Sequence, residues 1–105
     1  MPTRTPRMAQ LEALIADDPA DAELKYFLAM EYVSAGDEAT AADELLKLTH
    51  STEYVPAFLQ AGQVLNRVGR VPEACDALRR GIVIARRVGN THAEGEMAGL
   101  LSSLD

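Results

Sequence analysis

The sequence contains no tryptophan, one cysteine and 5% aromatic residues. A single cysteine cannot form an internal disulfide, so a disulfide-stapled fold is excluded. Cys75 lies beside Ala74 in a helical pattern, which favours a small buried residue over a nucleophile. No stretch approaches the roughly 20 consecutive apolar residues that a membrane-spanning helix needs. Because segment 1–6 is polar, we expect no signal peptide, no membrane association and a cytoplasmic location.

Positive charge is also scarce, because 10 Lys and Arg stand against 16 Asp and Glu, and the formal net charge is −6. Such a surface does not release counterions from phosphate, so we expect neither nucleic acid nor an anionic membrane as a partner. The charge is uneven: residues 1–57 hold four basic and eleven acidic residues, and residues 58–105 hold six and five. This asymmetry is typical of solvated helix faces. Its alternative is head-to-tail association into a weak homo-oligomer.

Apolar residues recur at spacings of three and four along most of the chain, which predicts helices rather than strands. Proline, glycine and capping residues divide the pattern at regular intervals. In the second helix, Leu24, Phe27, Leu28 and Tyr32 lie on one face and are predicted to point inward. Segment 50–52 is predicted to be the turn after the third helix. The six predicted helices cover residues 7–17, 21–35, 38–48, 56–68, 72–88 and 91–104.

Two stretches of the chain repeat at an offset of 33 residues. Each contains a glycine where a helix is expected to end and a small residue early in the helix that follows. A period between about 20 and 50 residues is typical of stacked-repeat proteins, in which one unit cannot bury its apolar face alone. The paired residues are Tyr32 and Leu65, Gly36 and Gly69, Ala41 and Ala74, and Leu45 and Leu78.

These residue types at these spacings resemble the tetratricopeptide repeat, a helix–turn–helix unit of about 34 residues. Its pattern of a large and then a small residue on the first helix is supplied by Leu28–Ala29 in the first repeat and by Phe58 with Ala61–Gly62 in the second. The resemblance implies an all-α fold of antiparallel helix–turn–helix repeats, stacked as a right-handed superhelix in one domain over residues 1–105. We expect a leading helix at 7–17, repeats at 21–54 and 55–88, and a capping helix at 91–104.

The resemblance also implies a non-enzymatic protein–protein interaction module or adaptor. In this family, the first helix of each repeat lines a concave groove that holds an extended peptide or a partner's helix. Tyr26, Met30, Val33 and Leu59 are apolar, and we predict that they lie opposite the inward stripe. Two alternatives stay open: a terminal helix covers them, or they are exposed singly. The groove residues that the resemblance implies are Glu23, Tyr26, Phe27, Met30, Val33, Ser34, Leu59, Gln60, Gln63, Asn66 and Arg67.

One subclass of ligand is disfavoured. Some members of the family hold a C-terminal carboxylate with lysine and asparagine at set groove positions, and this chain has Tyr26, Met30 and Gln60 there. Arg67 remains able to pair with one acidic group.

Arg79 and Arg80 are followed seven residues later by Arg86 and Arg87, about two helical turns, so we predict one basic helix face. It is expected to be solvated. The alternative is contact with the acidic half of another copy, which would make the chain a self-assembling structural scaffold.

Catalysis, metals and cofactors have little support in the sequence. His92 and Glu96 are four residues apart on a helix and could share a metal ion, but no third ligand is near and no His-Glu-x-x-His motif is present. We therefore expect no catalytic, metal or cofactor site.

Overall fold

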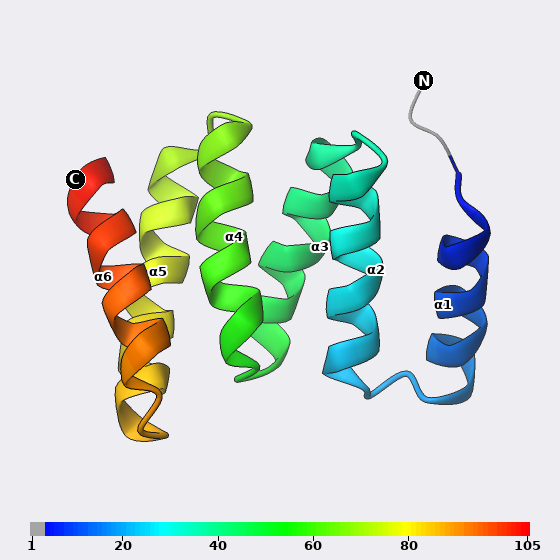
Figure 1. Ribbon diagram of the computed structural model, residues 1–105, viewed down its shortest axis with the longest axis horizontal. Coiled ribbons are helices and arrows are strands. Elements are labelled where there is room, and N and C mark those ends of the chain that lie inside the picture. The colour runs from blue at the N-terminus through cyan, green and yellow to red at the C-terminus, as the bar shows by residue number, and fades with distance from the viewer. Residues whose placement is uncertain (1–3) are drawn as a thin grey trace.

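Six helices follow one another up and down across the molecule (Figure 1). The computed structural model of the protein describes residues 4–105, which contain no strand. The predicted all-α fold with six helices is confirmed. The helices are α1 (Pro6–Asp17), α2 (Ala22–Ser34), α3 (Glu38–Ser51), α4 (Val55–Arg67), α5 (Val71–Arg87) and α6 (Thr91–Leu104).

The starts of the helices are fixed by short polar side chains and by proline. Asp21, Asp37 and Asn90 each accept a hydrogen bond from the backbone N–H three residues ahead, at 3.0, 3.2 and 3.0 Å. These bonds satisfy donors that the first helical turn leaves without a partner. Proline occupies the first turn of α1, α4 and α5, where its missing N–H costs nothing.

Helix α3 continues to Ser51, so the prediction that residues 50–52 form the turn was wrong for its first two residues. The Thr49 hydroxyl donates to the Leu46 carbonyl at 2.7 Å, and the Ser51 hydroxyl donates to the Lys47 carbonyl at 3.0 Å. Hydroxyl side chains are common in turns, but they can also bond back along a helix, as they do here. Thr49, in this added part of α3, accepts two hydrogen bonds from Arg80 of α5.

The two turn glycines are used in the same way. Gly36 and Gly69 have φ of +84° and +85°, a conformation that residues with a Cβ rarely adopt. Each is followed by a residue whose N–H donates back into the helix: Asp37 to the Tyr32 carbonyl at 2.9 Å, and Arg70 to the Leu65 carbonyl at 2.8 Å. The 33-residue repeat is therefore also a repeat of backbone geometry.

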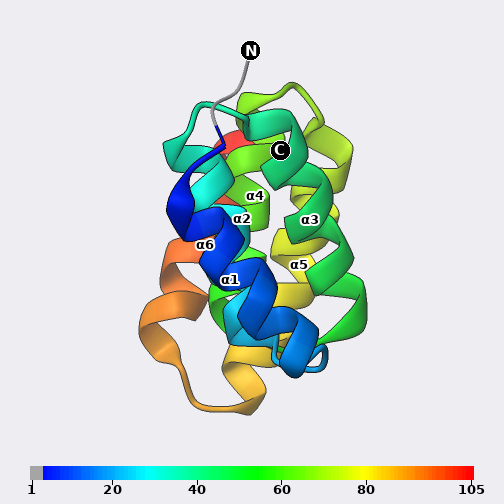
Figure 2. The same ribbon diagram turned by 90° about the vertical axis from the view of Figure 1, so that its right-hand side faces the viewer.

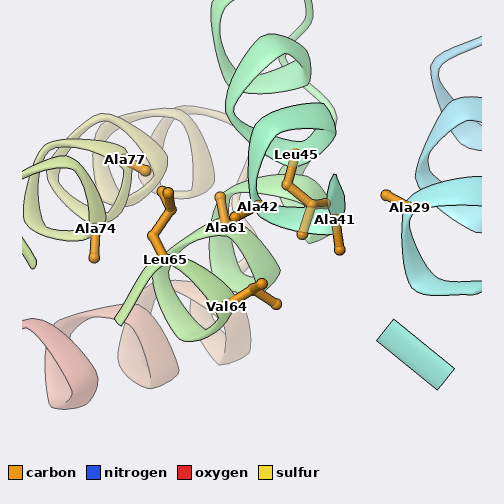
Figure 3. Close-up of a cluster of buried hydrophobic side chains, with 9 residues drawn as sticks. All are labelled: Ala29, Ala41, Ala42, Leu45, Ala61, Val64, Leu65, Ala74 and Ala77. Carbon is orange, nitrogen blue, oxygen red and sulfur yellow. The ribbon is translucent and has the colours of Figure 1, made fainter. Parts of the chain in front are cut away.

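The first of two buried clusters joins α2, α3, α4 and α5 (Figure 3). Most of its members are alanines, which let neighbouring helices approach closely. Its larger side chains, Leu45, Val64 and Leu65, are fully buried. The cluster comprises Ala29, Ala41, Ala42, Leu45, Ala61, Val64, Leu65, Ala74 and Ala77.

The second cluster joins α4 and α5 to α6 through Phe58, Leu78 and Met97. Helix α6 packs on both α4 and α5, and α1 packs on α2 by burying Met8 and Leu11. Figure 2 shows α3 and α5 together on one side of the molecule and α2 and α6 on the other. The helices thus form two layers with different exposed faces.

Candidate functional site

The eleven predicted groove residues all keep some accessible surface, since none of them is buried. On α2, Glu23, Phe27 and Ser34 are exposed, whereas Tyr26, Met30 and Val33 are half-buried. On α4, Arg67 is exposed, and Leu59, Gln60, Gln63 and Asn66 are half-buried.

The outward stripe predicted for α2 needs correction. Tyr26 and Val33 pack against the first buried cluster, so they do not lie opposite the core. Phe27, which was predicted to point inward, is 39% exposed, and the buried residue of α2 is Ala29. The spacing of large apolar residues gave the wrong face because alanine, not phenylalanine, fills the closely packed position.

An aromatic cluster forms at the start of α2. The Tyr26 ring meets the Tyr54 ring edge to face at a centroid distance of 5.3 Å, and the Phe27 ring lies 6.0 Å from Tyr26. The Tyr54 hydroxyl donates to Glu23 Oε2 at 3.3 Å. Burial raises the pKa of Tyr26, and burial together with the Glu23 carboxylate raises the pKa of Tyr54, so both phenols stay protonated at neutral pH. Tyr54 was absent from the predicted site because it precedes α4 rather than lying on a groove helix.

Two predicted groove residues of α4 contact other residues of the same chain. Leu59 packs against the second buried cluster, which α6 completes. Arg67 Nε lies 2.9 Å from Glu38 Oε1, which ties the end of α4 to the start of α3. Among the other predicted groove residues, Phe27 and Met30 on α2 are apolar and Gln60, Gln63 and Asn66 on α4 carry amides.

The four arginines of α5 are directed toward two different neighbours, so the prediction of one basic face was wrong. Arg79 pairs at 3.0 Å with Asp105, the residue after α6, and Arg86 pairs at 2.9 Å with Glu94 of α6. Their side chains join neighbouring segments while remaining 56% and 68% exposed.

Arg80 and Arg87 are directed toward α3 and the loop after it. Arg80 donates to the Thr49 carbonyl at 2.6 Å and to the Thr49 hydroxyl at 3.1 Å, and its guanidinium lies 5.6 Å from the centre of the Phe58 ring. Arg87 pairs with Glu53 at 2.5 Å. The seven-residue spacing thus generates two separate basic stripes.

A further arginine, Arg70, joins α3 to the first turn of α5. Arg70 Nη1 lies 2.6 Å from Asp43 Oδ1, and Arg70 Nε lies 2.7 Å from Glu73 Oε1. These bonds hold the pKa of Glu73 below its ordinary value and raise that of Arg70.

A hollow of the surface lies outside the predicted groove. This α3–α5 hollow of about 680 Å³ is lined by residues Thr49–Glu53 at the end of α3, by Phe58, and by Arg79, Arg80, Val83, Ile84 and Arg87 of α5. A smaller one, the α1–α3 hollow of about 210 Å³, is lined by Ile15, Lys25, Leu28, Glu44, Lys47, Leu48 and Ser51. Sequence reasoning missed both, although the paired arginines of α5 were the available signal.

Residues 4–105 are the part of the chain that the structure describes. No group of three or more His, Cys, Asp and Glu side chains there is arranged to hold a metal ion, and His92 pairs only with Glu96. None of its helices is both long enough and apolar enough to cross a membrane.

Comparison with known proteins agrees with this geometry. A sequence model described as tetratricopeptide repeat matches residues 2–55. A TPR repeat-containing protein of Pseudomonas aeruginosa is 29% identical over 96 residues, which cover 90% of this chain and 91% of the relative.

Two solved structures of a tetratricopeptide repeat domain protein from Salinibacter ruber have similar folds. The solution structure has a TM-score of 0.76 and 25% identity, covering 84% of this chain and 90% of its own. The crystal structure has a TM-score of 0.75 and 24% identity, covering 80% and 96%.

Proposed function

The chain belongs to the tetratricopeptide repeat family, and we propose that it binds a peptide or a partner's helix in the groove lined by α2 and α4. Members of this family act as non-enzymatic modules in protein–protein interaction. The observation that carries the proposal is Phe27, an aromatic side chain that is 39% exposed on a groove-lining helix beside Tyr26. Exposed aromatic residues supported by packed neighbours are the usual anchors of protein interfaces.

The two groove helices contribute different chemistry. Phe27 and Met30 offer apolar contact on α2, and burying them against a partner would supply most of the affinity. Gln60, Gln63 and Asn66 on α4 carry amides that both donate and accept, which suits the backbone of an extended peptide. The Arg67–Glu38 pair is exposed enough for Arg67 to exchange Glu38 for a ligand carboxylate.

The proposal is tested by capture from a lysate of the native organism on immobilised protein. The variant Phe27→Ser with Met30→Ser removes the apolar anchors without touching a buried residue. The control variant Leu14→Ser with Val88→Ser removes two exposed apolar residues that lie outside the groove.

We expect the groove variant to lose captured proteins that the control retains, with both showing the helical circular dichroism of the unmodified chain. An identical set of captured proteins from both variants would refute groove binding.

Self-assembly is the second candidate function, and it rests on Leu14, which is 51% exposed on the terminal helix α1. The arginines of α5 argue against the predicted route to assembly, because their ion pairs form within one chain. Light scattering across the micromolar range separates the two functions. A mass that stays monomeric removes assembly, and a mass that rises with concentration but not in Leu14→Ser supports it.

A further inference from the structure

The α3–α5 hollow and the α1–α3 hollow meet at the end of α3, where Ser51 lines both. They also occupy equivalent places in successive units of the repeat. Lys47 in the smaller hollow lies 33 residues before Arg80 in the larger one, and Ser51 lies 33 residues before Ile84. The repeat therefore generates two adjoining hollows, each with a basic side chain at the same position.

The lining of these hollows has a charge opposite to that of the rest of the chain. Five of the ten Lys and Arg residues lie there, against two of the sixteen acidic residues, Glu44 and Glu53, while Asp105 and Asp76 pair with Arg79 and Arg80 from outside the lining. A concentration of one sign of charge in a concave surface focuses the local potential. We name this region the basic surface, and its basic residues are Lys25, Lys47, Arg79, Arg80 and Arg87.

Apolar side chains lie between the basic ones. In the larger hollow, Phe58 and Ile84 form a buried floor and Val83 is 60% exposed. In the smaller hollow, Leu28 and Leu48 lie beside Lys25 and Lys47. A ligand that fits this lining presents apolar groups between acidic ones, which is the composition of an acidic peptide rather than of a free phosphate.

The basic residues differ in how firmly they are held. Arg80 is fixed by three hydrogen bonds to Asp76 and Thr49, and its bond to the Thr49 carbonyl offsets the partial negative charge at the end of α3. Arg87 and Lys47 are more exposed, and their partners Glu53 and Glu44 lie at the rim in exposed ion pairs, which contribute little. They can exchange these partners for the carboxylates of a ligand at small cost.

From this lining we propose that the basic surface binds an extended acidic segment of a partner protein, with carboxylates on Lys47 and Arg87 and apolar side chains over Leu48 and Val83. The charge complementarity of this lining with an acidic segment identifies the occupant. An extended chain of about ten residues spans roughly 33 Å, so it can cover both hollows of a molecule whose longest dimension is 37 Å. This docking site does not depend on the groove of α2 and α4.

The test titrates the whole protein into a fluorescein-labelled peptide of about ten residues in which glutamate and leucine alternate, and follows fluorescence anisotropy. A peptide with glutamine in place of glutamate shows how much of the binding depends on charge. The surface variant is Lys47→Gln with Arg87→Gln, one substitution in each hollow. The matched control is Arg7→Gln with Arg86→Gln, which changes the net charge equally but lies outside both hollows and outside the groove.

We expect the surface variant to weaken binding of the glutamate peptide by about tenfold, the matched control by less than about twofold, and added salt to weaken binding to the unmodified chain. The amide resonances that shift on binding should cluster at residues 47–53 and 79–87. Equal weakening in the two variants would overturn the proposal, because the peptide would then be sensing only overall charge.

Two other results would also overturn it. Loss of peptide binding in Phe27→Ser with Met30→Ser would place the peptide in the groove. A concentration-dependent rise in the mass of the unmodified chain that Lys47→Gln with Arg87→Gln abolishes would identify a second copy as the occupant. Failure of groove capture leaves this titration unaffected, so the two proposals fail separately.

Discussion

Replacing Gly81 with alanine tests whether helix spacing in the second repeat depends on a missing side chain. A Cβ at Gly81 would lie 2.6 Å from Phe58 Cβ and 2.6 Å from Met97 Sδ. Carbon atoms in contact prefer about 3.5–4.0 Å, so α4 and α5 must separate by about 1 Å or Phe58 must shift. The Met97 sulfur can move, but Phe58 Cβ is attached directly to the backbone of α4. Overpacking of this kind costs about 1–3 kcal/mol.

The substitution also brings a gain, because alanine is favoured over glycine inside a helix by roughly 0.5–1 kcal/mol. We therefore expect a net loss of about 1–2 kcal/mol for Gly81→Ala, and a melting temperature lower by roughly 5–15 °C. Thermal unfolding followed by circular dichroism measures this shift.

Gly99→Ala is the matched control, because Gly99 is also inside a helix and a Cβ there meets nothing within 4 Å. It should stabilise the chain by roughly 0.5–1 kcal/mol, since only the helix preference remains. If Gly81→Ala and Gly99→Ala shift the melting temperature in the same direction by similar amounts, the argument from close approach at Gly81 is refuted.

Three further predictions concern other contacts. Leu45→Ala, in the first cluster, should lower the free energy of unfolding measured in urea by about 2–5 kcal/mol, because the surrounding alanines cannot fill the space, and a loss below 1 kcal/mol would contradict this packing. Asn90→Ala should cost about 1 kcal/mol through loss of the α6 cap, whereas Asn90→Asp should retain most of the stability. Because Arg70 holds the pKa of Glu73 below its ordinary value of 4.5, the unfolded chain binds the proton first as pH falls. The stabilisation is therefore present above that value and lost below it, and Arg70→Gln should flatten this acid dependence in thermal unfolding between neutral and acid pH.

The helices and their order could be predicted from the sequence because local signals agree with one another. Pro56 and Pro72 mark helix starts, Gly36 and Gly69 mark helix ends, and these signals recur at the period of the apolar pattern. In segment 49–52 the local signals for helix and for turn conflict, and a tertiary contact decides between the two. Thr49 is buried and receives Arg80, so the helix is extended through residues that are typical of turns.

The candidate site could be predicted less well, because which face of a helix is buried depends on how closely its neighbour approaches. The spacing of Phe27 fits an inward stripe, but Ala29 is the residue of α2 that is buried against its neighbours. The basic surface could not be predicted from the sequence for a related reason. It combines the end of α3 with the middle of α5, and only the packing of these helices brings Thr49 to Arg80.

The 33-residue offset shows how the two faces differ. Groove positions of α2 and α4 that are related by the repeat have unlike chemistry, since Phe27 corresponds to Gln60 and Met30 to Gln63. A ligand bound in the proposed groove would therefore present an apolar end to α2 and a polar end to α4, and this would fix its direction. On the other face, Lys47 and Arg80 keep the same charge at equivalent positions, so a segment bound there meets one basic side chain at that position in each unit. The groove should therefore select the direction in which a ligand binds, and the basic surface should select a ligand by its content of acidic and apolar residues.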